Sequence, residues 1–163
     1  MKRIRTDDTQ LRRLMLMLVL SVFCKVASCQ TIDSVFADYR GLSAARYSLL
    51  KKEALRQGAK WLHLDLPADQ ADRLDSVRVL SLSRCRADVK QHFADATECL
   101  EDMGYERQDE WGNEATVAVR VYTLSDDHGH PETVVRITGR HTMLLQLYGE
   151  VDIGVIHKLT DTL

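Results

Sequence analysis

The stretch ATVAVRVYTL, residues 115 to 124, has the clearest strand pattern in the sequence. Two sets of residues alternate in it, Ala115, Val117, Val119 and Val121 in one set and Thr116, Ala118, Arg120 and Tyr122 in the other. Successive side chains of a β-strand point to opposite faces of a sheet. This period of two therefore predicts a long strand with its valine face on a core.

The same period continues on both sides of this stretch. Residues 105–110 precede it as a strand, and residues 133–140 and 143–150 follow it as two more, with a turn at 111–113 and a polar loop at 125–131. Short turns between alternating strands predict an antiparallel meander of four strands.

A helix is expected just before the meander. Its apolar residues recur in steps of three and four, as Cys85, Val89, Phe93, Ala96, Leu100 and Met103. This spacing gives one apolar stripe on a helix that Ser83 caps and Gly104 ends. Because nothing polar interrupts the stripe, it is interpreted as core rather than as a ligand groove.

The remaining segments complete the fold class. Helices are predicted at 32–39 and 51–62, strands at 45–50 and 76–82, and a closing helix after its cap at Asp152. Segment 45–50 also fits a helix. The class is α+β: an antiparallel β-meander covered on one face by helices, with a β-α-β-α start and a C-terminal helix.

The N-terminus has the features of a secretory signal peptide in their usual order. Lysines and arginines begin it, the eleven uncharged residues 14–24 follow, and the small residues Ala27 and Ser28 come next. A membrane-spanning helix needs roughly 20 apolar residues, so this run is too short to cross a bilayer. The order predicts export. An amphipathic or buried N-terminal helix is the alternative.

Two cleavage sites fit this segment. Cleavage before Cys29 is suggested by Val26-Ala27-Ser28-Cys29, which resembles the bacterial lipobox and makes Cys29 the lipidation candidate. Cleavage after Cys29 would leave an ordinary mature chain beginning at Gln30. The protein is thus divided into a signal peptide, 1–29, with a possible lipobox that ends at Cys29, and a single α+β domain, 30–163. The domain is expected in the periplasm or lipid-anchored at a bacterial membrane, with the lipid anchor as its only membrane association.

Removal of residues 1–29 makes the chain more acidic. That segment holds 6 of the 22 Lys and Arg and 2 of the 24 Asp and Glu, so the formal net charge changes from −2 to −6. Binding to nucleic acid requires clustered basic residues that neutralise phosphates. The rest of the sequence has no such cluster, and nucleic acid is not expected as a partner.

Catalytic patterns are sparse in the sequence. Cys85 and Cys99 would lie ~21 Å apart on one helix, which is too far for a disulfide. His92 would lie ~10 Å from Cys85, too far to activate its thiol. No glycine-rich phosphate loop precedes a helix, and no Ser-His-Asp order stands out. The sequence therefore predicts no enzymatic activity and no cofactor.

The loop at 125–131 supports a second function hypothesis. His128 and His130 beside carboxylates are ligand types for zinc, so the alternative is a metal-dependent hydrolase. Their spacing matches no closed metal site, and a solvated hairpin loop is the favoured interpretation. Trp111, at the preceding turn, either contacts a ligand or folds back on the sheet, and folding back is favoured.

The polar face of the meander is the candidate binding face. Alternation places on it Arg120, Tyr122, Arg136, Gln146 and Tyr148, together with Thr138. Arg and Tyr are enriched at protein interfaces. The first hypothesis is thus a non-catalytic binding or interaction domain of the cell envelope, whose partner is an envelope protein, a glycan or a second copy. A solvated face without a partner is the plainer alternative.

The two ends of the domain carry a family resemblance. The motif Gly149-x-Val151-Asp152-Ile153-x-x-Ile156-x-x-Leu159, with Ile32-Asp33-Ser34-Val35-Phe36 after the export signal, resembles the exported Bacteroidetes domain-of-unknown-function family number 4252. The resemblance spans residues 31–163 and implies export and one small domain. It implies no catalytic residues. The motif also has a structural interpretation, because Asp152 can cap a helix that its apolar residues dock.

Overall fold

The computed structural model describes residues 31–56, 66–113, 116–125 and 131–161. The part from Thr31 to Leu163 forms one compact unit. The predicted signal segment, 1–29, lies outside the described residues, and so does the histidine loop, 126–130.

Within the described residues, six antiparallel strands form one sheet, in the order β1-β2-β6-β5-β4-β3. The strands are β1 (Arg46–Lys51), β2 (Leu74–Ser81), β3 (Glu106–Asn113), β4 (Val117–Ser125), β5 (Pro131–Gly139) and β6 (Met143–Gly149). The α+β class and the predicted meander, β3 to β6, are confirmed. The strands β1 and β2 extend the meander beyond β6, because β2 pairs with β6.

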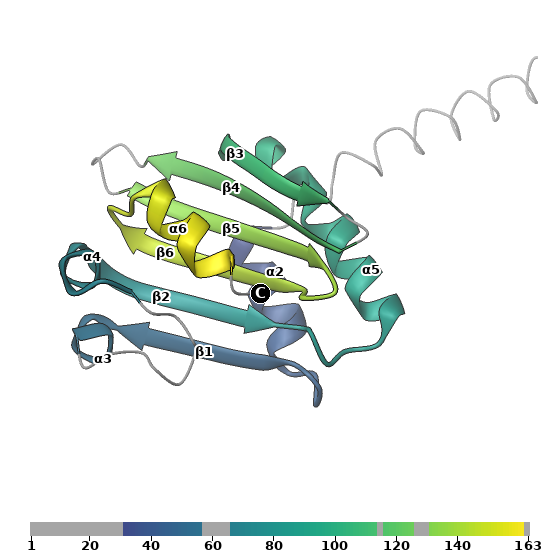
Figure 1. Ribbon diagram of the computed structural model, residues 1–163. Coiled ribbons are helices and arrows are strands. Elements are labelled where there is room, and N and C mark those ends of the chain that lie inside the picture. Colours follow the sequence, from purple (N-terminus) through teal and green to yellow (C-terminus); the bar gives the residue numbers. More distant parts are fainter. Residues whose placement is uncertain (1–30, 57–65, 114–115, 126–130, 162–163) are drawn as a thin grey trace, which may run out of the picture. The chain divides into compact units, whose positions relative to one another are not determined.

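The helices are α2 (Ile32–Arg40), α3 (Lys52–Arg56), α4 (Ala68–Arg73), α5 (Ala87–Ala96), the 3-10 helix η2 (Glu98–Met103) and α6 (Ile153–Thr160). The predicted cap of the last helix is confirmed, since the Gly154 amide donates to the Asp152 carboxylate at 2.6 Å. Figure 1 shows α6 on the near face of the sheet and α2 on the far face.

Helices cover both faces of the sheet, so the prediction that they cover only one face is wrong. On the first face, here called the α6 face, residues such as Val121, Val135 and Leu145 pack with Leu55 and Ile156. The second face, the α2/α5 face, buries a separate apolar cluster. Its members are Ile32, Val35, Phe36, Tyr39, Leu80, Leu82, Phe93, Leu100, Tyr105, Tyr122, Val134 and Leu144.

Helices cover the α2/α5 face because the polar face predicted from the sequence also carries apolar residues. Val134 and Leu144 share that face with Arg136 and Gln146, because they occupy the same alternating positions of β5 and β6. The apolar stripes of α2 and α5 need a surface to bury against. Val134 and Leu144 supply it, and the sheet becomes the middle layer of three.

The helix predicted over 85–103 is divided at Thr97, and Ser83 does not cap it. α5 begins at Ala87 after Arg86, and η2 follows from Glu98. In an uninterrupted α-helix the Ala94 carbonyl would accept from the amide four residues later. Here it accepts from the Arg136 guanidinium at 2.8 Å and from the Thr97 hydroxyl at 3.3 Å, at the point where the helix breaks. The predicted end at Gly104 is confirmed by its left-handed φ of 91°.

Candidate functional site

Arg136 is the most deeply placed charged residue of the predicted binding face. It lies on β5 with a side-chain exposure of 3%. Its Nε donates to Thr97 Oγ1 at 2.8 Å, and its Nη2 donates to the Ala94 carbonyl and to the Glu98 carboxylate, both at 2.8 Å. A cation beside the carbonyls at the C-terminal end of a helix is stabilised by the helix dipole. The three bonds also supply acceptors for most N–H groups of the buried guanidinium.

Arg120 extends this network to the neighbouring strand. Its Nη1 donates to both carboxylate oxygens of Glu98, at 3.1 and 3.2 Å, and its Nε donates to Glu110 at 2.9 Å. Glu98 is therefore shared by two arginines from adjacent strands. The hydrogen bond from the Arg120 guanidinium also holds the pKa of Glu110 below its usual value.

Gln146 is the centre of a second polar network on the same face, and it is fully buried. Its Nε2 donates to Glu132 at 2.6 Å and to the Tyr148 hydroxyl at 2.7 Å, and its Oε1 accepts from Arg78 at 2.8 Å. Arg78 also pairs with Asp33 of α2. The network thereby links α2 to three strands of the sheet.

Two aromatic rings complete this second network. The Arg78 guanidinium lies 4.1 Å from the centre of the Phe36 ring, within the range of a cation–π contact. The Tyr105 hydroxyl donates to Glu132. The pKa of Tyr105 is raised above its usual value, mainly because the phenol is buried and also because it bonds the Glu132 carboxylate. The phenol therefore remains a hydrogen-bond donor.

The candidate binding face is therefore internal, and its predicted exposure is wrong. The structure does bring its residues to one face of the sheet. Tyr122, Arg136 and Gln146 are buried there, and Arg120 and Tyr148 are half-buried. Their partners Arg78, Thr97 and Glu98 were not predicted from the sequence. Only the apolar neighbours Val134 and Leu144 signal that a cover is needed.

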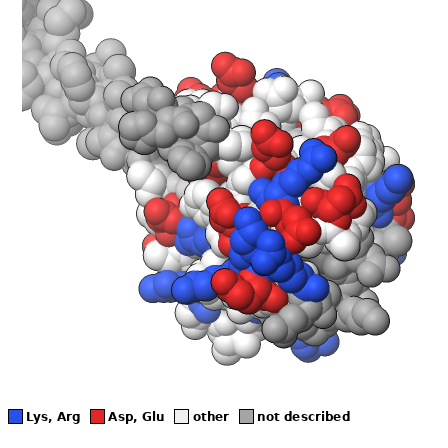
Figure 2. All heavy atoms as spheres, turned by 90° about the vertical axis from the view of Figure 1, so that its left-hand side faces the viewer, with Lys and Arg blue, Asp and Glu red and all other residues white. Residues whose placement is uncertain are grey.

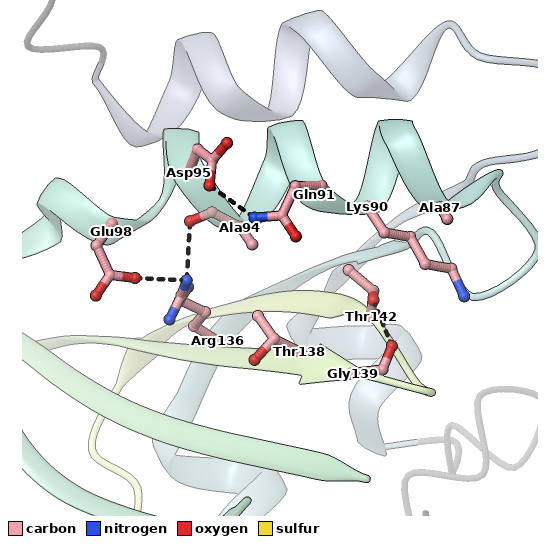
Figure 3. A pocket seen from close by; sticks show the side chains of 10 residues that line it. All are labelled: Ala87, Lys90, Gln91, Ala94, Asp95, Glu98, Arg136, Thr138, Gly139 and Thr142. Atoms are coloured by element: carbon pink, nitrogen blue, oxygen red, sulfur yellow. Dashed lines mark hydrogen bonds and ion pairs between the residues drawn. The ribbon is translucent and has the colours of Figure 1, made fainter. Parts of the chain in front are cut away.

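A groove lies between α5 and the turn that joins β5 to β6 (Figure 3). Its volume is about 540 Å³. It is lined by Ala87, Lys90, Gln91, Ala94, Asp95, Glu98, Arg136, Thr138, Gly139 and Thr142. Figure 3 shows Glu98 and Arg136 at one end and Lys90 at the other.

The polar groups of the groove are held by contacts within the chain. Gln91 Nε2 donates to Asp95 Oδ1 at 2.9 Å, and Lys90 Nζ donates to the Arg140 carbonyl at 3.3 Å. Thr142 Oγ1 donates to the Gly139 carbonyl at 3.1 Å. The described lining contains two cationic and two anionic side chains, and it contains no histidine, cysteine or aromatic residue. Such a lining suits a polar ligand without a large net charge.

Trp111 folds back on the domain, as predicted. Its indole stacks on the His157 ring of α6, with ring centroids 3.6 Å apart and the planes at 19°. His157 Nε2 also lies 2.9 Å from the Asp109 carboxylate of β3. Contacts among these three side chains hold α6 against β3, the outer strand of the meander.

Loss of the Asp109 carboxylate is expected to destabilise the domain in a pH-dependent way. The hydrogen bond with His157 lowers the pKa of Asp109 below its usual value. A lowered folded-state pKa stabilises the fold above the unfolded pKa of about 3.9, and this stabilisation disappears as the pH falls through the folded-state value. The urea midpoint of Asp109→Asn should be below that of the wild type at about pH 6 and should approach it at about pH 2.5. A midpoint difference that does not change with pH would contradict this assignment.

The hydrolase alternative rests on His128 and His130, which lie outside the described residues. Among the residues that the structure does describe, no group of three or more His, Cys, Asp and Glu could hold a metal ion.

Cys85 and Cys99 are not joined to each other in a disulfide. In the same described ranges, no helix is long and apolar enough to cross a membrane.

The face at the side of α3 and α4 carries charges of both signs, interspersed rather than grouped (Figure 2). Two ion pairs join these helices and the start of β2 there, Arg56 with Asp72 at 2.7 Å and Lys52 with Asp75 at 3.4 Å. Among the described residues, this face therefore lacks the clustered cations that phosphate binding requires.

Comparison with protein-family models, with curated proteins and with solved structures gives no match to this chain. The resemblance to the exported Bacteroidetes family accordingly stays a prediction.

Proposed function

We propose that this protein is exported to the cell envelope, where its folded part acts as a non-catalytic binding domain. The groove between α5 and the β5–β6 turn is its recognition site. The observation that carries the proposal is the fixed arrangement of charges in the groove, where Arg136 is held by Glu98 and Asp95 by Gln91. Polar groups that are already oriented lose little freedom when a ligand binds.

The same arrangement favours binding over catalysis. A catalytic nucleophile needs a base within hydrogen-bond reach. In the groove the Thr142 hydroxyl donates to a backbone carbonyl, and the Glu98 carboxylate accepts from two arginines. These groups are engaged with the chain itself. A polar segment of an envelope protein is the favoured partner, and a glycan or a second copy are the alternatives.

The groove is tested by photo-crosslinking in living cells. A benzoylphenylalanine in place of Gln91, which is exposed on α5, should give a discrete covalent adduct with a partner. The matched control carries the same group in place of Asp72, which is exposed on α4 away from the groove. Equal adducts from both positions, or no adduct from Gln91, would contradict the groove as a recognition site.

Export is proposed from the order of charged, apolar and small residues in 1–29. The protein recovered from cell envelopes should lack residues 1–28 if Cys29 is lipidated, or 1–29 if cleavage follows Cys29. Intact mass distinguishes the two, and incorporation of a labelled fatty acid identifies lipidation. Recovery of the uncleaved chain from the cytoplasm would refute export.

A further inference from the structure

The two edges of the sheet, β1 and β3, are built differently (Figure 1). An edge strand presents unpaired backbone groups, and proteins protect such edges with charges and bulges. β3 has both protections. It carries Glu106, Arg107, Asp109 and Glu110, and its register with β4 shifts between Arg107 and Asp109. It is a poor template for another strand.

β1 has no register shift, and its charged residues, Arg46 and Lys51, stand only at its two ends. Its six residues pair with β2 in one continuous register, from Arg46 opposite Ser81 to Lys51 opposite Ser76. Within the described residues no strand pairs with its outer side. Leu49, in the middle of β1, is 50% exposed, and Leu42, just before it, is 38% exposed. In the described part of the chain these are the exposed large apolar side chains.

The charges of β1 indicate what can bind there. Arg46 and Lys51 are exposed at its two ends. If two copies paired through this edge, the basic residues of both would gather along one short ribbon, and like charges on adjacent strands are destabilising. An acidic segment would instead neutralise both ends.

We infer that β1 is a docking edge for an extended acidic segment of a partner protein, which adds to the sheet as a seventh strand. Antiparallel addition continues the pattern of the sheet. In that direction the residue opposite Lys51 comes two positions before the residue opposite Leu49, and the residue opposite Arg46 comes three positions after it. The fitting segment has an acid at its first position, an apolar residue at its third and an acid at its sixth.

The docking edge is separate from the groove, because β1 contributes no residue to the groove lining. The proposals for the docking edge and for the groove can therefore be tested independently. A variant of one leaves the other unchanged.

The test uses two capped hexapeptides and NMR titration of the labelled domain. The acidic probe is Glu-Thr-Val-Thr-Thr-Glu, and the control is Lys-Thr-Val-Thr-Thr-Lys. The acidic probe should shift the amides of β1 and bind about tenfold more tightly than the control, from two attractive in place of two repulsive cross-strand pairs. The double variant Arg46→Glu with Lys51→Glu should reverse the preference, and both positions are exposed, so folding should be retained.

Three results would overturn the proposal. One is equal binding of the two peptides to the wild type. Another is a set of amide shifts that lies away from β1. The third is a wild-type dimer that dissociates in Leu49→Asn, which would assign the edge to a second copy of this chain.

Discussion

Replacement of Gly149 by alanine is expected to destabilise the domain by about 4 kcal/mol, from backbone strain and overpacking together. Gly149 ends β6 with a φ of +116°, a backbone conformation that residues with a Cβ rarely adopt. An added Cβ would lie 2.3 Å from the Arg73 carbonyl oxygen and 2.9 Å from the Leu74 Cα. Both neighbours are backbone atoms at the junction of α4 with β2, so this junction would have to move.

The measurement is urea unfolding of the purified domain, with Gly41→Ala as the matched control. Gly41 has a φ of −85°, and a Cβ added there would meet nothing within 4 Å, so its substitution should change stability by less than about 0.5 kcal/mol. If Gly149→Ala were as stable as Gly41→Ala, the close approach of β6 to the α4–β2 junction would be wrong.

Replacement of Arg136 by methionine is expected to cost about 3 kcal/mol, because it removes one partner of a buried hydrogen-bonded network. Methionine keeps most of the apolar volume, so the loss reports on the polar contacts. The Ala94 carbonyl loses the Arg136 donor and keeps the Thr97 hydroxyl at 3.3 Å. Glu98 loses one of the two arginines that share it and keeps its ion pair with Arg120. The junction between α5 and η2, which Arg136 holds to the sheet, should also exchange its amide hydrogens faster.

Arg56→Met is the control for this substitution. Arg56 pairs with Asp72, but its side chain is 57% exposed, and such surface pairs contribute at most about 1 kcal/mol. Urea midpoints compare the two variants, and amide hydrogen exchange reports on Thr97 and its neighbours. Equal stability of Arg136→Met and Arg56→Met would mean that Arg136 is not the internal support that its contacts indicate.

Local patterns in the sequence were enough to predict most of the elements. The period of two around Val119 indicated the strands of the meander, and the capped apolar stripe after Asp152 indicated α6. These features depend on residues close together in the chain. The pairing of β2 with β6 does not, because it joins segments about seventy residues apart and no local pattern records it.

The candidate site was mispredicted because polarity was equated with exposure. Arg136 and Gln146 alternate with valines and leucines as surface residues do. They are buried because partners from distant elements satisfy them, Thr97 and Glu98 for Arg136 and Arg78 for Gln146. Such partners can be found only once the helices are placed. The groove could not be predicted for the same reason, since α5 and the β5–β6 turn meet only in the folded chain.

Helices cover both faces of the sheet, so the polar face is internal, and we therefore propose that recognition takes place at the groove and at the β1 edge. Hydroxyl-radical footprinting of the folded domain, comparing Tyr122 with Leu49, tests whether the polar face is covered. Tyr122 is 2% exposed beneath the α2/α5 layer, whereas Leu49 is 50% exposed. We expect that Leu49 is oxidised in the folded protein and that Tyr122 is oxidised only after unfolding in urea. Oxidation of Tyr122 in the folded protein at its unfolded rate would contradict a helical cover on the α2/α5 face.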